Sequence, residues 1–209
     1  MSTTLSLRCR CGAVRGIATD VTPRAVSHVV CYCDDCRAFA RWLGQDGLLD
    51  AHGGTDIVQL APRALRITEG AEHLRCMRLS DRGMFRFYTE CCRTPFGNTI
   101  SAKVPFVGMP SACMAEALEA AGAPREAIVG PARGIQARFA LGGMPANADR
   151  TAGVGVIWRI SSRLFRWWRR GEGHPSPHFD DATGAPRWPV QVLTPDERAA
   201  LRDAEQRSA

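Results

Sequence analysis

Residues 31–36 are Cys-Tyr-Cys-Asp-Asp-Cys, and Arg37 follows directly. The stretch places three thiols within six residues at a C-x-C-x-x-C spacing. Thiols this close can turn inward on one centre, and a soft, tetrahedral ion such as zinc is the most frequent occupant of such a centre. We therefore interpret Cys31, Cys33 and Cys36 as zinc ligands. Three thiolates leave one corner of a tetrahedron without a ligand from this segment.

Two other interpretations of the cluster exist: a disulfide framework, or free cysteines packed as small apolar residues. Residues 1–5 have neither the basic region nor the apolar region of a secretory signal peptide. We therefore expect a reducing, cytoplasmic location, where clustered cysteines favour metal ligation over disulfides. The sequence has no run of about 18 apolar residues that would predict a membrane span.

The composition is that of an ordinary globular chain: 209 residues, 45% hydrophobic and 23% charged. Such a chain can build a core without a metal to compensate for small size. The net charge of +6 comes from 27 basic and 21 acidic residues, and arginine supplies nearly all of the basic ones. A high genomic GC content gives the same bias, so arginine content alone does not indicate nucleic-acid binding.

Short alternating or apolar runs separated by turn residues predict a mainly β domain over residues 4–103. Asp34 or Asp35 is expected to cap a short helix that contains Cys36 and ends at Gly44. The predicted strands are 4–8, 13–17, 27–31, 56–60, 64–68, 74–79 and 84–89.

A second group of thiols lies at two predicted turns. Cys9 and Cys11 flank the tip of the first hairpin, and Cys91 and Cys92 follow the strand at 84–89. A structural metal site of Cys9, Cys11 and Cys92 is predicted, completed by Cys91, another side chain or water. Adjacent cysteines on an extended strand point to opposite faces, so Cys91 joins only if the backbone turns there. The chain is thus expected to bind one or two Zn²⁺ ions, the alternative at this second group being reduced, packed thiols.

Residues 104–209 differ in character and predict a partly helical C-terminal extension. Residues 115–121 are alanine-rich and helical. The glycine- and proline-rich segment 130–145 predicts a loop with short regular pieces, and 171–189 predicts a loop. A capping box at 194–197 predicts a terminal helix over about 195–206.

The segment 154–170 predicts an amphipathic helix rich in arginine and tryptophan. It has three interpretations: contact with an anionic membrane surface, nucleic-acid binding, or cover for the β domain with its arginines in solvent. Nucleic acid is the least favoured, because the aromatic residues are not interleaved with the arginines for base stacking. One face is expected to carry Arg159, Arg163, Arg166 and Arg170, and another Ile157, Ser161, Leu164 and Trp168.

The remaining cysteines and histidines predict no further site. Cys76 and Cys113 are expected to be packed thiols. Among the histidines, His28 is the best candidate for a fourth ligand or a proton carrier, because it alone lies near a thiol cluster in the sequence. His174 and His178 lie in a proline-rich loop whose spacing specifies no metal site.

Three motifs together resemble the glutathione-dependent formaldehyde-activating enzyme and centromere-protein-V family. They are Cys-x-Cys-Gly-Ala-Val-Arg at 9–15, Cys-x-Cys-x-x-Cys-Arg at 31–37 and Cys-Arg-Thr-Pro-Phe at 92–96. The resemblance covers about residues 4–100 and implies twisted antiparallel sheets with two zinc sites. Two departures concern the last motif: Thr89 stands where the family has a cysteine, and Arg93 where glycine is usual.

The resemblance implies that Cys9, Cys11 and Cys92 hold a structural zinc. It implies that Cys31, Cys33 and Cys36 hold the functional zinc of a carbon–sulfur lyase, whose substrate is a small thiol adduct such as that of glutathione with formaldehyde. Arg37 could bind a carboxylate of that substrate, or form a surface ion pair. The alternative is a non-catalytic zinc module that docks to a membrane surface or a protein partner through residues 154–170.

Overall fold

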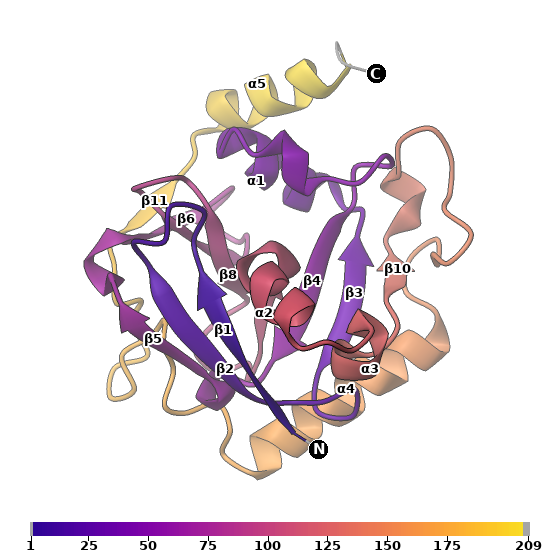
Figure 1. The fold of residues 1–209 in the computed structure, drawn as a ribbon. Helices are drawn as coiled ribbons and strands as arrows, with labels where there is room; N and C mark the ends of the chain where they lie inside the picture. Colours follow the sequence, from indigo (N-terminus) through magenta and orange to yellow (C-terminus); the bar gives the residue numbers. More distant parts are fainter. Residues whose placement is uncertain (1, 207–209) are drawn as a thin grey trace.

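The structure, a computed structural model, describes residues 2–206, with side chains described for residues 2–201. The fold is mainly β with a partly helical C-terminal half, as the sequence predicts (Figure 1). The strands are β1 (Thr3–Arg8), β2 (Arg15–Val21), β3 (Ser27–Cys31), β4 (Thr55–Leu60), β5 (Leu65–Glu69), β6 (Leu74–Arg78), β7 (Phe85–Thr89), β8 (Pro95–Thr99), β9 (Val107–Pro110), β10 (Arg133–Ile135) and β11 (Val190–Val192).

The strands form a small antiparallel sheet, β1-β2-β5, and a large sheet of order β10-β3-β4-β9-β8-β7-β6-β11. The edge strands β10 and β11 come from beyond residue 103 and pair in parallel with β3 and β6. The large sheet therefore runs across the predicted boundary at 103–104, and a division there stays a prediction. Residues 207–209 of the predicted extension lie outside the described residues.

The prediction of a loop with short regular pieces over 130–145 is consistent with β10, which the sequence did not locate. Gly134 lies in the middle of that strand, and a Cβ there would lie 2.3 Å from the Cβ of Ala148. Glycine at this position reflects the close approach of another segment, and the same residue type ordinarily predicts a turn.

Strand β4 shows how the two faces of the large sheet are covered. Val58 and Leu60 point to one face and join the main core with Leu5 and Leu7 of the small sheet. Ile57 points to the other face, in a cluster that Ile160 also contacts. This alternation follows from the two-residue period of a strand, and it places protein on both sides of the large sheet.

The helices lie mainly around the rim of the fold. In Figure 1, α1 and α5 lie together at the upper edge and α4 runs along the lower edge. The α-helices are α1 (Asp34–Trp42), α2 (Ala115–Ala120), α3 (Arg125–Val129), α4 (Val154–Arg169) and α5 (Pro195–Gln206). Short 3-10 helices occupy Asp46–Leu48, Pro62–Ala64, Ala71–His73, Ser111–Met114 and Ala137–Phe139.

Helix ends test the capping predictions directly. The expected aspartate cap of α1 is wrong: Cys33 is the N-cap residue, and Asp34 and Asp35 lie in the first turn, where carboxylates complement the helix dipole. The capping box of α5 is confirmed, since the Thr194 backbone N–H donates to Glu197 at 2.8 Å and the Glu197 N–H donates to the Thr194 hydroxyl at 3.3 Å.

Helix α4 packs on the β domain, but through a different face from the one predicted. Val156, Arg163 and Trp167 are buried, whereas Ile157 and Trp168 of the expected apolar face are exposed. The expectation that the arginines stay in solvent is wrong for Arg163. Its guanidinium donates to the backbone carbonyls of residues 23 and 24 and to the hydroxyl of residue 27, at 2.8–3.2 Å.

Candidate metal centres

Two groups of cysteines among the described residues could each hold a metal ion, and within each group the sulfur atoms all lie within 4.8 Å of one another. Both are the groups that the sequence singled out. The first brings together Cys9, Cys11, Cys91 and Cys92, and the second Cys31, Cys33 and Cys36. All nine cysteines of the chain are free thiols, so the disulfide interpretation has no support.

The four-sulfur group forms where two turns meet. The first turn joins β1 to β2, and Gly12 has a φ of 80°, which glycine adopts without strain. The second turn joins β7 to β8, and Arg93 has a φ of 55°. Because the backbone turns after Thr89, neighbouring Cys91 and Cys92 both reach the same centre. The condition that the sequence set for Cys91 is therefore met.

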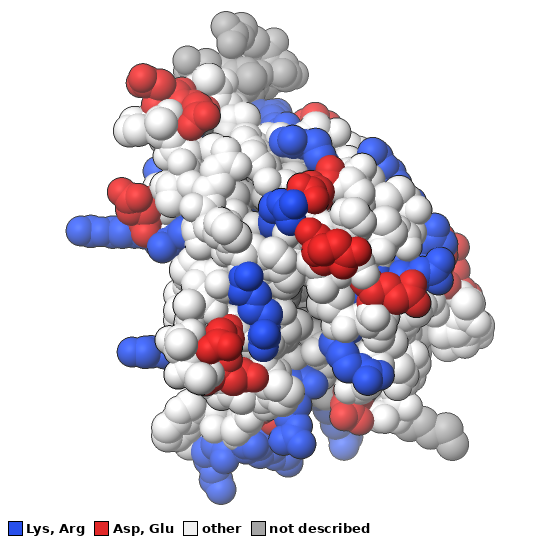
Figure 2. All heavy atoms as spheres, turned by 90° about the vertical axis from the view of Figure 1, so that its left-hand side faces the viewer, with Lys and Arg blue, Asp and Glu red and all other residues white. Residues whose placement is uncertain are grey.

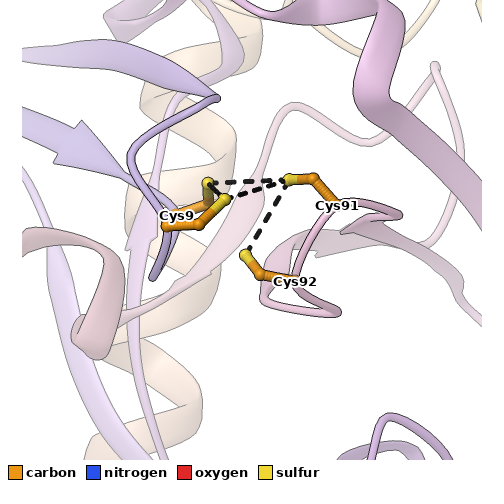
Figure 3. A group of neighbouring side chains, drawn as sticks. Cys9, Cys91 and Cys92 are labelled. Atoms are coloured by element: carbon orange, nitrogen blue, oxygen red, sulfur yellow. Dashed lines mark hydrogen bonds between the residues drawn. The ribbon is translucent and has the colours of Figure 1, made fainter.

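The spacing of the four sulfurs suits a tetrahedral ion (Figure 3). Sulfur–sulfur distances are 3.5 Å for Cys9–Cys11, 3.9 Å for Cys9–Cys91, 3.4 Å for Cys11–Cys91 and 3.9 Å for Cys91–Cys92. A tetrahedron of thiolates at the usual zinc–sulfur distance has edges of about 3.8 Å. The donor set and its size therefore fit zinc with little rearrangement.

Two threonines prepare Cys92 for ligation. The hydroxyls of Thr89 and Thr94 lie 3.4 Å and 3.1 Å from its sulfur. Burial opposes ionisation, but hydrogen bonds from both threonines and from the Cys11 backbone and side chain lower the pKa of Cys92 to about 5. Thr89 thus supports a ligand although it stands where the resembled family has a cysteine, and Cys91 supplies the fourth sulfur.

This group joins the two sheets. Cys9 and Cys11 follow a strand of the small sheet, and Cys91 and Cys92 follow a strand of the large one. Further hydrogen bonds cross the same junction, from the Arg10 backbone N–H to the Thr94 hydroxyl at 3.1 Å and from the Arg10 guanidinium to the Cys92 carbonyl at 3.3 Å. A metal ion here would fasten the sheets at one end of their shared core.

The three-sulfur group is built from a short stretch of backbone. Cys31 ends β3, Cys33 caps α1, and Cys36 lies in the first turn of that helix, where its N–H donates to the Cys33 carbonyl at 3.0 Å. The Cys31 and Cys33 sulfurs are 3.4 Å apart, which again fits a zinc tetrahedron. Cys31 and Cys36 are each 8% exposed, and Cys33 is half-buried.

Arg86 of β7 is a member of this site that sequence reasoning missed. It is 2% exposed, and its guanidinium lies 5.2 Å from the ring centroid of Phe39 on α1. Hydrogen bonds with Cys31 and Cys33, followed by the charge and hydrogen bond of Arg86, hold the pKa of Cys36 well below its usual range. In the predicted strand 84–89, Arg86 alternates with aromatic residues, which is the pattern of a charged side chain that points to solvent. No local sequence pattern indicates that α1 covers it.

Beside Cys36 lies a cavity of about 20 Å³, lined also by Phe39, Ile57 and Arg86. A space of this size holds about one water molecule. Cys33, the most exposed member of the three, is the sulfur that a larger ligand could reach from solvent.

Comparison with known proteins places the chain in a family. Residues 1–187 match DUF6151, a family of unknown function. The chain belongs to this family. No curated protein matches the sequence. A crystal structure of a Rhodobacter sphaeroides protein aligns with a TM-score of 0.42 at 18% identity, over 62% of this chain and 99% of the other.

The remaining candidate residues of this DUF6151 member lie outside both groups. Arg37, expected to meet a substrate carboxylate or to form a surface ion pair, forms an ion pair with the partly exposed Asp34 at 2.9 Å, although its own side chain is buried. It also donates to the Phe139 carbonyl at 3.0 Å. His28, the candidate fourth ligand, bonds the Gly130 carbonyl and Asp56 at 2.8 and 2.9 Å and joins neither group.

The other thiols and one loop histidine are packed in the core. Cys76 and Cys113 are each 1% exposed, which confirms the expectation of packed thiols, and Cys113 donates to the Pro95 carbonyl at 3.0 Å. His178 is fully buried and stacks on Phe87 at 4.1 Å between ring centroids.

No helix within residues 2–206 has the length and apolar character needed to cross a bilayer.

Proposed function

We propose that this protein binds two zinc ions and acts as a carbon–sulfur lyase on a small thiol adduct of the glutathione type. The four-sulfur group would hold the structural ion, and the group of Cys31, Cys33 and Cys36 the functional one. The observation that carries the proposal is the inequality of the two groups: among the described residues, three sulfurs converge at the second centre and no fourth ligand side chain joins them.

The number of ligands separates the two roles. A zinc ion with four protein ligands is closed, whereas one with three keeps a position for substrate or water. Bound at the second group, zinc would supply a site that holds a thiol sulfur as thiolate. The motifs at 9–15, 31–37 and 92–96, which resemble those of the formaldehyde-activating enzymes, favour glutathione and formaldehyde as the substrate class.

The charges around the three sulfurs suit this task. Three thiolates around a divalent cation carry a net negative charge, which weakens its power to make hydroxide from water. The buried guanidinium of Arg86 offsets that charge beside Cys36. A further anionic sulfur is therefore tolerated better than the cysteines alone would allow, and Arg86 acts as a positioning residue.

The reaction balances without a redox partner. In the lyase direction the carbon–sulfur bond of the hydroxymethyl adduct breaks, and its electron pair returns to sulfur. The hydroxyl oxygen forms the aldehyde π bond and gives its proton to solvent. The reverse direction joins the thiol sulfur to the aldehyde carbon. The chain's task is to orient the sulfur and to limit the access of water, and burial of Cys31 and Cys36 supports that task.

Cobalt-substituted protein tests the proposal. Titration with glutathione should change the thiolate-to-cobalt absorption bands of wild type and accelerate formaldehyde release from S-hydroxymethylglutathione. The Cys33→Ser variant should lose both responses, while Cys76→Ala, a cysteine outside both groups, should keep them. A metal-loaded wild type that shows neither response would overturn the lyase and leave a non-catalytic zinc module.

A further inference from the structure

The outer face of α4 carries large apolar side chains that are each more than half exposed in the described part of the chain. Its large side chains are strongly exposed: Val154 by 85%, Ile157 by 52%, Trp158 by 73%, Phe165 by 58% and Trp168 by 66%. At 3.6 residues per turn these five positions fall on one side of the helix. We call them the α4 outer face.

This face is not needed to hold the helix in place. Val156, Arg163 and Trp167, on the opposite side, already anchor α4 to the β domain. A helix on a protein surface normally turns charged and polar groups to solvent. Two exposed tryptophans and a phenylalanine on one helix face, two of them in ring contact at 6.1 Å, indicate a surface that meets another phase or molecule.

The surroundings of the outer face are strongly basic. Residues 154–170 contain five arginines and neither aspartate nor glutamate. Burial, followed by the charges of Arg159 and Arg166, lowers the pKa of Arg163 to about 10, so the cations already repel one another. Figure 2 shows basic side chains gathered at the lower end of the molecule, the end along which α4 runs in Figure 1.

A cavity of about 420 Å³ lies beside the C-terminal half of α4. Its arginines outnumber its acidic residues, but Trp167 also lines it, so the cavity lies on the buried side of α4. The arginine that borders the outer face is the exposed Arg169, which directly follows Trp168. Asp20 and Glu172 also line the cavity, and Glu172 lies 3.6 Å from Arg170. The four arginines of the cavity are Arg24, Arg63, Arg166 and Arg170.

We propose that α4 docks this protein onto an anionic lipid surface. The outer face would enter the headgroup region, and the exposed Arg169 and Arg170 at the end of α4 would meet headgroup phosphates. Tryptophan and phenylalanine beside arginine match the interface between headgroups and acyl chains. Charge complementarity favours this occupant over a second copy of the chain, because a second copy would bring its own arginines against these.

Vesicle flotation with the full-length, metal-loaded protein tests the docking. Wild type should float with vesicles containing 30% phosphatidylglycerol in phosphatidylcholine and remain unbound with pure phosphatidylcholine. Binding should weaken as salt rises, because counter-charges screen the arginines. Trp158 and Trp168 should shift their fluorescence to the blue on binding, as they leave water.

Two sets of variants separate the apolar and the charged parts. Trp158→Gln with Trp168→Gln should weaken vesicle binding at least tenfold, since two large side chains no longer enter the interface. Arg169→Gln with Arg170→Gln should weaken binding to the anionic vesicles by roughly fivefold per arginine. The matched controls, Val192→Gln on β11 and Arg198→Gln on α5, should bind as wild type.

Inorganic phosphate distinguishes the source of the ligand. At millimolar concentration it should compete only weakly with vesicles, because it lacks the acyl phase that the outer face enters. Equal binding to neutral vesicles, no binding to either kind, or unaltered binding by the tryptophan pair variant would overturn the proposal. A concentration-dependent dimer that the tryptophan pair variant abolishes would also overturn it, and would assign the outer face to a second copy.

Discussion

The two cysteine groups use the same ligand chemistry in opposite ways. The four-sulfur group brings together residues 82 positions apart, from turns of two different sheets, at a partly exposed junction. The three-sulfur group spans only residues 31–36, lies largely buried, and holds no distant segments together. Closing a long loop removes more entropy from the unfolded chain than closing a short one. The proposal therefore assigns stability to the first group and ligand binding to the second.

Loss of a ligand from each group should give the largest contrast. Cys11→Ser should lower the free energy of unfolding by on the order of 4 kcal/mol, the value that loop closure predicts for a link of this length. Cys33→Ser should lower it by only about 2 kcal/mol, the value that the same relation gives for a loop of this short length. Urea denaturation of both variants, loaded with zinc, measures the difference. Equal losses would contradict the division of roles.

Arg86→Gln should act on the three-sulfur group alone. The variant removes the cation that offsets the thiolates, so zinc affinity there should fall about 10- to 100-fold, with the four-sulfur group unchanged. Competition with a chromophoric chelator measures both affinities. The control is Arg163→Gln, a buried arginine of α4 outside both groups. An equal loss of affinity in the control would mean that any buried arginine has this effect.

Thr89→Val and Thr94→Val should act on the four-sulfur group alone. Each variant removes a hydroxyl that bonds the Cys92 sulfur, so each should cost about 1 kcal/mol, or roughly fivefold in zinc affinity. Competition with a chromophoric chelator measures the zinc affinities of both groups in these variants. A selective loss at the three-sulfur group would show that the two sites are coupled.

The free energy of unfolding should also depend on pH through His178, independently of any metal. Burial lowers the pKa of His178 from 6.5 to about 4. Between these values the unfolded chain binds a proton that the folded chain does not, so stability is complete above pH 6.5 and falls by roughly 3 kcal/mol as pH drops to 4. His178→Gln should flatten this part of the stability curve of metal-free protein. If stability falls just as steeply with decreasing pH in this variant, His178 does not cause the loss.

Spacing made much of the candidate site predictable. Three cysteines within residues 31–36, and a CxC pair at a hairpin tip, are local patterns that report where the sulfurs point. Cys91 depended on a turn after Thr89, which the sequence could state only as a condition. The small strands at both edges of the large sheet were not predicted, because three-residue strands such as β10 and β11 carry too little periodicity.

The missed features are those that depend on tertiary packing. Arg86 alternates with aromatic residues as a solvent-facing charge would, and only the position of α1 over β7 buries it. Arg163 lies on the basic side of its helix, yet backbone carbonyls before β3 meet its guanidinium. In both cases the partner is distant in sequence, so no local pattern could reveal it.

Metal analysis of protein purified without added zinc tests the central claim most directly. The account predicts two equivalents of zinc in wild type, with one remaining in Cys11→Ser and one remaining in Cys33→Ser. Wild-type protein that contains no metal, yet stays folded and is indifferent to chelators, would contradict it.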